Sequence, residues 1–558
     1  MAAGGGLGRA SALMASGSMV SRVLGIVRNA LLVACVGSMG GTSDAFQTAN
    51  TLPNTIFILL SGGVLSAVLI PEITRAMARE DGGQDIIDRL LTAAFGLVTI
   101  VAVAATLLAA PLITLFQLQG PARDLGIFFA YLCLPQIFFY GVSAILGQVL
   151  NAHDRFAAVM WTPVLANVVQ IAGMGIFLSQ YLGAQPAERW TPPMIWLLAG
   201  TATLGVAVQA VALIPALRGT GFRFTPRWGW RGYGFRRPFR VAVWTISALL
   251  IGQAGGVVVT MVANAVASAA REAGVVVAGY MVYTLAFQIF MVPHGIITTS
   301  ILTALYPRMA RSAHAGDVAG LRSDVTRALT VPALIMVPIS AAAVALAAPG
   351  VKVLTPSLEP PGVTSLAWAF SLMAVGLFPY GVVALQQRYA LARGDGRMNV
   401  RFQLVVTGVQ LLSCGAALLV PPAWAVAVIC AGQTLGNGLA ALAFVAVAQR
   451  QVGGLPLRRL GVLLLRLVVV SVPAALLAGG AVAWVSGALP FAWTTSLLAL
   501  GAGTAAFLVA FALGTRLLRI PELDATLPRR FRPAGAAGAA GAADTHTPGS
   551  NSGTGDGV

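Results

Sequence analysis

The chain has 558 residues, of which 57% are hydrophobic and only 9% are charged. This composition excludes a soluble multidomain protein and indicates a polytopic membrane protein. The apolar stretches are long runs that lack the alternating polar positions of a membrane β-barrel. We therefore predict helical spans and an all-α fold.

The 35 basic residues outnumber the 18 acidic ones, and the net charge is +17. In a soluble protein this excess would suggest a nucleic-acid partner. Here the arginines recur in short clusters between apolar runs, as the positive-inside rule requires, so no nucleic-acid partner is predicted. The loops on one side of the membrane carry 28 basic residues and those on the other side carry 4. This difference predicts that both termini are cytoplasmic and that the number of spans is even.

Fourteen segments are long and apolar enough to cross a bilayer as helices of about 20 residues. They begin near residues 12, 46, 90, 125, 157, 192, 240, 275, 328, 363, 399, 423, 459 and 491. The final segment, 521–558, is mostly Ala, Gly, Thr and Ser, so we predict a disordered cytoplasmic tail there.

The two halves of the chain share a repeat at an offset of roughly 236 to 240 residues. Segments 89–111 and 327–349 match at Arg, Leu-Thr and Ala-Ala-Pro, and Tyr-Gly-Val-x-Ala occurs at both Tyr140 and Tyr380. Because an even number of helices separates the copies, both insert in the same orientation, which is typical of transporters. The predicted division is a six-helix lobe at 1–217, an Arg-rich cytoplasmic linker at 218–239, a second six-helix lobe at 240–450, and two extra helices at 451–520.

Two arginines lie inside the first predicted span, where a charge costs about 2.5 to 3.5 kcal/mol on insertion scales. Arg22 lies about a dozen residues into this span, and Arg28 follows six residues later. Both can face one cavity if Gly25 lets the helix bend. The alternative for Arg22 is that its aliphatic stem carries the charge to the membrane surface.

The second predicted span is too polar on one face for lipid. It opens with Asp44 and carries the polar residues Gln47, Asn50 and Asn54, and Pro53 interrupts the helix. Asp44 either caps the start of this helix or pairs with an arginine in the cavity. The matching segment of the second half has Gln288 and His294, and a histidine between Pro and Gly is more typical of packing than of proton transfer.

No nucleotide-binding motif, zinc-protease motif or paired carboxylates are visible in the sequence. The four cysteines fall in apolar segments and lack the spacing of metal ligands. We therefore predict a transporter rather than an enzyme, with no metal and no cofactor. The outer loops are short and poor in acids, which disfavours a membrane glycosyltransferase.

Several motifs in both halves of the chain are shared with a known family. Residues 21–28 read SRVLGIVR, and Ser43-Asp44-Ala-Phe46 and Leu52-Pro53-Asn54 follow in the second span. Further motifs lie at 155–158, 163–167, 388–390 and 395–397. Together they resemble the MurJ (MviN) family of lipid II flippases in the MOP transporter superfamily, and the resemblance covers about residues 10–450.

The resemblance implies a V-shaped pair of lobes around a cationic cavity. Such a protein carries lipid II, the undecaprenyl-pyrophosphate-linked disaccharide pentapeptide, from the inner to the outer leaflet of the bacterial cytoplasmic membrane. The family's functional positions fall on Arg22, Arg28 and Asp44, and the other candidate substrate-binding residues are Asn54 and Gln288. Arginine suits a pyrophosphate because its forked guanidinium stays charged. The implied partners are lipid II, membrane lipids and cell-wall synthesis proteins.

This chain departs from many members of the family at two places. Thr55, Ile56 and Phe57 stand where those members carry basic residues, and Gln288 stands where they carry an arginine. We therefore expect a less cationic cavity. Two alternatives stay open: a flippase for another polyprenyl-linked glycan, and a drug or ion antiporter, for which Asp44 is the candidate membrane-embedded acid.

Overall fold

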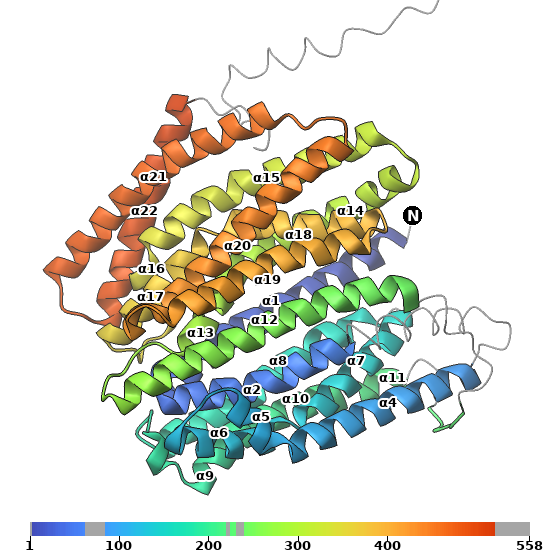
Figure 1. Cartoon of the computed structure of the whole chain (residues 1–558), viewed down its shortest axis with the longest axis vertical. Coiled ribbons are helices and arrows are strands. Elements are labelled where there is room, and N and C mark those ends of the chain that lie inside the picture. The colour runs from blue at the N-terminus through green and yellow to red at the C-terminus, as the bar shows by residue number, and fades with distance from the viewer. Residues whose placement is uncertain (1–2, 62–83, 154, 219–223, 230–238, 519–558) are drawn as a thin grey trace, which may run out of the picture.

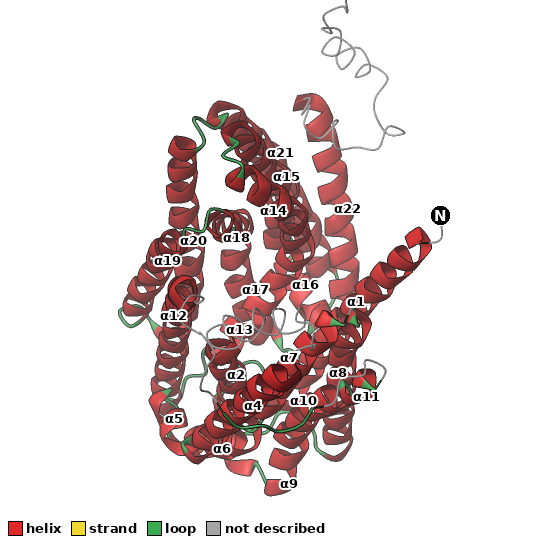
Figure 2. Cartoon of the chain, turned by 90° about the vertical axis from the view of Figure 1, so that its right-hand side faces the viewer, coloured by secondary structure: helices red, strands yellow, loops and turns green. Residues whose placement is uncertain are grey.

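The computed structural model describes residues 3–61, 84–153, 155–218, 224–229 and 239–518 (Figure 1). Within these ranges the chain is helical and has no strand, which confirms the all-α prediction (Figure 2). The predicted C-terminal tail, residues 521–558, lies entirely outside the described residues.

The first group of helices, which we call the N-side bundle, runs from α1 to α11. Its members are α1 (Ala3–Val36), α2 (Gly41–Leu60), α4 (Gln84–Leu107), α5 (Ala109–Leu115), α6 (Gly120–Cys133), α7 (Gln136–Ala152), α8 (Phe156–Gln180), α9 (Pro192–Ile195), α10 (Thr201–Val211) and α11 (Ile214–Leu217). Helix α8 packs against both α1 and α10, α2 packs on α6, and α4 packs on α7.

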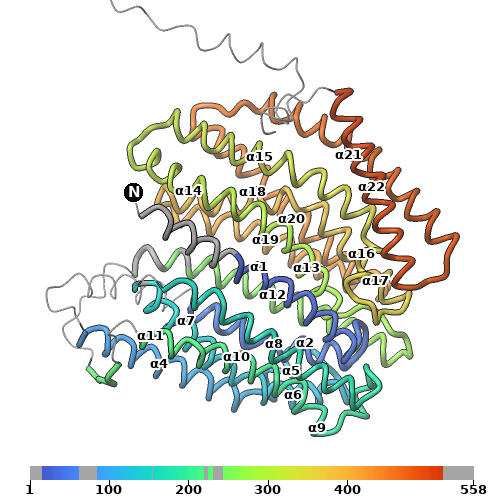
Figure 3. The backbone as a smooth tube through the Cα atoms, turned by 180° about the vertical axis from the view of Figure 1, so that it is seen from behind, coloured from blue at the N-terminus to red at the C-terminus, as the bar shows by residue number. Residues whose placement is uncertain are grey.

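The second group, the C-side bundle, runs from α12 to α20. Its members are α12 (Phe239–Glu272), α13 (Tyr280–Pro293), the π-helical turn η4 (His294–Thr298), α14 (Thr299–His314), α15 (Val318–Ala345), α16 (Ala347–Leu354), α17 (Pro360–Ala374), α18 (Leu377–Ala392), α19 (Gly396–Ala417) and α20 (Pro422–Gln451). Helices α21 (Leu457–Ala488) and α22 (Trp493–Leu518) pack on each other and against α15 and α16. They lie at the edge of the molecule, beyond the C-side bundle (Figures 1 and 3).

The repeat is visible in how matching helices break. Helix α4 ends at Leu107 and α15 ends at Ala345, and a short helix follows each after one residue. Pro111 and Pro349 stand four residues beyond these ends. Proline lacks an N–H and its ring clashes with the carbonyl four residues earlier, so it stops both helices at matching positions. Helices α1 and α12, which open the two halves, each have 34 residues.

The predicted number of fourteen spans is not reached by length and hydropathy alone. Within the described residues 12 helical segments meet both criteria, and the bent pair α17 and α18, which meet at 50°, would make 13. Helix α2, at the place of the second predicted span, is not among them. Its polar residues lower its hydropathy, and residues 62–83 after it lie outside the described part of the chain.

The described part of the Arg-rich linker, residues 224–229, lies against the N-side bundle. Arg227 forms an ion pair with Asp85 of α4 at 2.7 Å, and Arg89 of α4 pairs with the same carboxylate at 2.9 Å. Arg89 also donates a hydrogen bond to the carbonyl of Trp228 at 3.0 Å, and the Thr225 hydroxyl donates to Asp88. Helix α4, which corresponds to the predicted third span, therefore holds this part of the linker.

Two glycines in α8 provide a test of the packing against α10. A Cβ atom at Gly173 would overlap the side chain of Thr201, whereas a Cβ at Gly175 would meet nothing within 4 Å. We expect Gly173→Ala to destabilise the protein by about 1 to 3 kcal/mol through overpacking. Gly175→Ala is the matched control and should be neutral or slightly stabilising. Thermal unfolding of the two variants in detergent measures the difference, and equal melting temperatures would contradict this packing.

Candidate functional site

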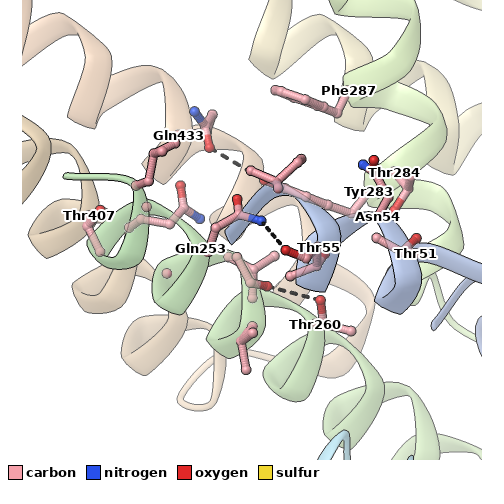
Figure 4. A pocket seen from close by; sticks show the side chains of 18 of the residues that line it. Thr51, Asn54, Thr55, Gln253, Thr260, Tyr283, Thr284, Phe287, Thr407 and Gln433 are labelled. Carbon is pink, nitrogen blue, oxygen red and sulfur yellow. Dashed lines mark hydrogen bonds between the residues drawn. The ribbon is translucent and has the colours of Figure 1, made fainter. Parts of the chain in front are cut away.

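A cavity of about 870 Å³ lies between the two bundles. On the N-side its walls come from α1, α2 and α7, and on the C-side they come from α12, α13, α18, α19 and α20. Figure 4 shows how threonines and Asn54 of α2 approach side chains of α12, α13 and α20 across this space. The cavity is therefore formed by both halves of the repeat.

The cavity wall is polar but almost uncharged. Among the described residues that line it, Arg28 is the only one with a full charge, and there is no aspartate or glutamate. Its polar surface comes mainly from eleven amide side chains: Gln47, Asn50, Asn54, Gln253, Gln288, Gln387, Asn399, Gln403, Gln410, Gln433 and Asn437. Amides offer both donors and acceptors, so the cavity suits a ligand with many neutral hydrogen-bonding groups and one anionic group.

Arg28 is linked to the opposite bundle through a short chain of hydrogen bonds. Its Nη2 donates to Oδ1 of Asn29 at 3.1 Å, and Nδ2 of Asn29 donates to Oε1 of Gln288 at 2.5 Å. Gln288 thus orients the neighbour of Arg28 while the remaining guanidinium N–H groups stay available for an anion. Three candidates from the sequence, Arg28, Asn54 and Gln288, line the same cavity.

Arg22 lies at the boundary between the bundles rather than in the cavity wall. Its side chain is exposed, and its Nη2 donates to the carbonyl of Gly295 in η4 at 3.4 Å. A Cβ atom at Gly295 would stand 2.8 Å from Nη1 of Arg22, so a larger residue there would displace the end of this side chain. Since His294 next to Gly295 lines the cavity, Arg22 stands beside the site.

Asp44 is fully buried and lies outside the cavity, at the end of the molecule where α2 and α13 begin. Its carboxylate pairs with Arg271 of α12 at 3.2 Å and accepts a hydrogen bond from the backbone N–H of Met281 at 3.0 Å. Its carboxylate therefore caps the start of α13 in the other bundle, and not the start of α2 as the first of the two alternatives predicted. Its basic partner is Arg271 in the last turn of α12, and not Arg22 or Arg28.

Further hydrogen bonds join the bundles at this same end. Nδ2 of Asn264 donates to the Thr48 hydroxyl at 3.0 Å and to the carbonyl of Phe116 at 3.1 Å. The hydroxyl of Ser268 donates to the carbonyl of Gln117 at 3.4 Å. We call the four side chains Asp44, Thr48, Asn264 and Arg271 the latch, because together they hold α2 against α12 and α13.

Most of the C-side wall of the cavity was not predicted from the sequence. Asn399, Gln403 and Gln410 fall on one face of α19, and Gln433 and Asn437 fall on one face of α20. Amides spaced by three, four or seven residues within an apolar span are the signal that identifies such a face.

Two bundles of candidate membrane-spanning helices that enclose a polar cavity are the architecture of a membrane transporter. The chain belongs to the family described as "Lipid II flippase MurJ", whose family model matches residues 35–517. The matched range begins after Arg22 and Arg28, so the case for these two residues rests on the geometry above.

Curated relatives agree with the family. A probable lipid II flippase MurJ of Vibrio cholerae is 25% identical over 407 residues, covering 70% of this chain and 73% of the relative. The corresponding protein of Synechocystis sp. is 25% identical over 535 residues, covering 93% of this chain and 96% of the relative.

Solved structures share the fold. Lipid II flippase MurJ in an inward closed conformation matches with a TM-score of 0.68 and 14% identity, covering 91% of this chain and 99% of that chain. An inward-facing multidrug resistance MATE transporter of the MOP superfamily matches with a TM-score of 0.63 and 18% identity, covering 79% and 98%.

The latch predicts that removing the charge of Asp44 loosens this end of the molecule. Ser268→Cys provides the reporter, since Ser268 is buried beside Arg271 and the four native cysteines are buried as well. Adding Asp44→Asn should raise the rate at which a membrane-impermeant thiol reagent labels this position by about tenfold, equivalent to about 1.4 kcal/mol.

The matched control is Glu272→Gln, which removes the same charge from an exposed side chain one residue after Arg271. It should leave the labelling rate unchanged. Equal labelling of the two double variants would show that the ion pair does not hold the bundles together.

Proposed function

We propose that this chain moves lipid II from the inner to the outer leaflet of the bacterial cytoplasmic membrane, with the headgroup passing through the cavity between the bundles. Membership of the lipid II flippase family supports this proposal. The observation that carries it is the placement of one arginine, Arg28, in a large cavity whose other described lining residues are uncharged. This combination matches a headgroup with one pyrophosphate and many hydroxyl and amide groups.

The proposed roles follow from position. Arg28 binds the pyrophosphate, Gln288 orients Asn29 beside it, and Asn54 donates to the headgroup from α2 in the same N-side wall. Arg22, next to the cavity and exposed, meets the pyrophosphate before it reaches Arg28. Asp44 acts through the latch and does not touch the substrate.

Transport by alternating access is part of the proposal. In this scheme the bundles rock about the cavity, and the latch closes its outer end until the headgroup is bound. The scheme takes the lobes to be residues 1–217 and 240–450, with the linker 218–239 and both termini on the cytoplasmic side. The cell-wall synthesis proteins that supply or consume lipid II are the proposed protein partners.

The alternatives differ in what the cavity must contain. A flippase for another polyprenyl-linked glycan would use the same pyrophosphate contact, and only the headgroup distinguishes it. A drug or ion antiporter usually carries an acid in its cavity for coupling, and the described lining residues include none. The cavity therefore favours a flippase.

The direct test is depletion of this protein in its own bacterium, followed by measurement of the lipid II content of each leaflet. We expect lipid II to accumulate in the inner leaflet and to fall in the outer one. An unchanged distribution, with a different polyprenyl-linked glycan retained inside, would identify the first alternative instead.

Complementation of the depleted strain tests Arg28. Arg28→Gln should lower the rate of lipid II transfer about ten- to a hundredfold, because a hydrogen bond to a charged group contributes about 1.5 to 3 kcal/mol. Arg28→Lys should restore part of the activity, since lysine keeps the charge but loses the fork. Arg123→Gln is the control, since Arg123 is exposed and bonds only Thr114 among the described residues. Full transfer by Arg28→Gln would refute the role of this residue.

Arg22 is tested in the same strain. Arg22→Ala should abolish transfer while leaving the protein in the membrane at normal amounts, because the charge next to the cavity is lost without any change in packing. Arg22→Lys should rescue only partly. Complementation by both variants at the level of the unchanged protein would assign Arg22 to the membrane surface.

A further inference from the structure

A row of aromatic rings on α13 borders the cavity. The rings of Tyr280 and Tyr283 lie 6.3 Å apart at 17°, and those of Tyr283 and Phe287 lie 6.5 Å apart at 2°. All three side chains are among the residues that line the cavity. Because Tyr283 and Phe287 are only half-buried, their rings offer an apolar surface to the space between the bundles.

Amide side chains stand around this aromatic surface. The Tyr283 hydroxyl donates to Oε1 of Gln433 on α20 at 3.4 Å, and Nε2 of Gln253 on α12 reaches the carbonyl of Thr55 at 3.5 Å (Figure 4). Both contacts are long for hydrogen bonds, so these amides can turn to a ligand at little cost. Figure 4 shows Gln253, Gln433, Tyr283 and Phe287 around one part of the cavity.

Two buried polar atoms in the same wall have no partner among the described residues. They are Oε1 of Gln410 and Nδ1 of His294, whose residues are 5% and 6% exposed. Buried polar groups are normally hydrogen-bonded, and an unsatisfied one costs about 1 to 3 kcal/mol. Both atoms are themselves covered by protein, so in this conformation they do not face a ligand in the cavity.

We propose that the aromatic face of α13, made of Tyr280, Tyr283 and Phe287, forms with Gln253 and Gln433 a subsite for the sugars of the headgroup. A pyranose ring has an apolar C–H face and a rim of hydroxyl groups. The aromatic rings bury the C–H face, and the amides donate to and accept from the hydroxyls. This inference rests on the proposed function and names the part of the substrate that this wall recognises.

The position of Arg28 supports the assignment. Gln288, which is tied to Arg28 through Asn29, directly follows Phe287 on α13. A sugar bonded directly to a pyrophosphate at Arg28 would therefore lie near Phe287, which is the end of the aromatic face closest to Gln288 in the sequence. A polyprenyl chain would instead leave the amides unsatisfied, and a peptide carboxylate would meet no second cation in the described lining.

The test measures binding of three lipids to the purified full-length protein in nanodiscs. The probes are lipid II, the same lipid without its pentapeptide, and undecaprenyl pyrophosphate, which has neither sugar nor peptide. Phe287→Leu keeps an apolar side chain but removes the ring, and Gln433→Leu removes the amide. Each should weaken binding of both sugar-containing lipids by about tenfold and leave undecaprenyl pyrophosphate unchanged. Phe128→Leu, at a ring that is 58% exposed on the outside of α6, is the matched control and should change nothing.

The outcomes separate the possibilities. Equal weakening of all three lipids would overturn the subsite, since the ring would then act on the pyrophosphate, the lipid chain or the fold. A loss confined to the lipid with its pentapeptide would also overturn it and assign the aromatic face to the peptide. A third outcome is that the unsubstituted protein binds the two sugar-containing lipids more tightly than undecaprenyl pyrophosphate and yet moves no lipid II between leaflets. This result would refute the proposed function and leave the sugar subsite standing.

Discussion

Lipid cannot form hydrogen bonds with a polar side chain, and the arrangement of the whole molecule depends on this constraint. Each bundle carries one polar face: α2 supplies it on the N-side, and α12, α19 and α20 supply it on the C-side. These faces are shielded from lipid only when the bundles stand opposite each other. The cavity lies between these two polar faces, where water or a ligand can form the hydrogen bonds that lipid cannot.

Much of the fold follows from local sequence signals, whereas the site depends on distant contacts. Pro111 and Pro349 stop matching helices by steric exclusion, so the repeat was readable in the sequence. Arg28 was identifiable because a charge inside an apolar span requires a polar neighbourhood. The partner of Asp44 was not, because Arg271 is 227 residues away and its own sequence context is that of a loop end. The aromatic face of α13 was missed since aromatic residues at helical spacing are equally typical of a core.

The latch is better suited to switching than to adding stability. Asp44 is fully buried, whereas the side chain of Arg271 remains 21% exposed. A buried ion pair gains little net stability over apolar packing, but loss of one partner leaves a charge without compensation. Separation of α2 from α12 and α13 would remove both Arg271 and the N–H of Met281 from Asp44, so its charge would need water or another donor in their place.

The single charge of the cavity also has an electrical consequence. In the proposed cycle a pyrophosphate diester enters the cavity and carries more negative charge than the guanidinium of Arg28 neutralises. By the described lining residues, the loaded cavity is then anionic and the empty cavity cationic. Moving one elementary charge through 100 mV changes the free energy by about 2.3 kcal/mol. An inside-negative potential then draws the loaded cavity outward and the empty one back inward. Voltage can thus bias both halves of a transport cycle without any coupled ion, and a second cavity arginine would remove the bias from the loaded step.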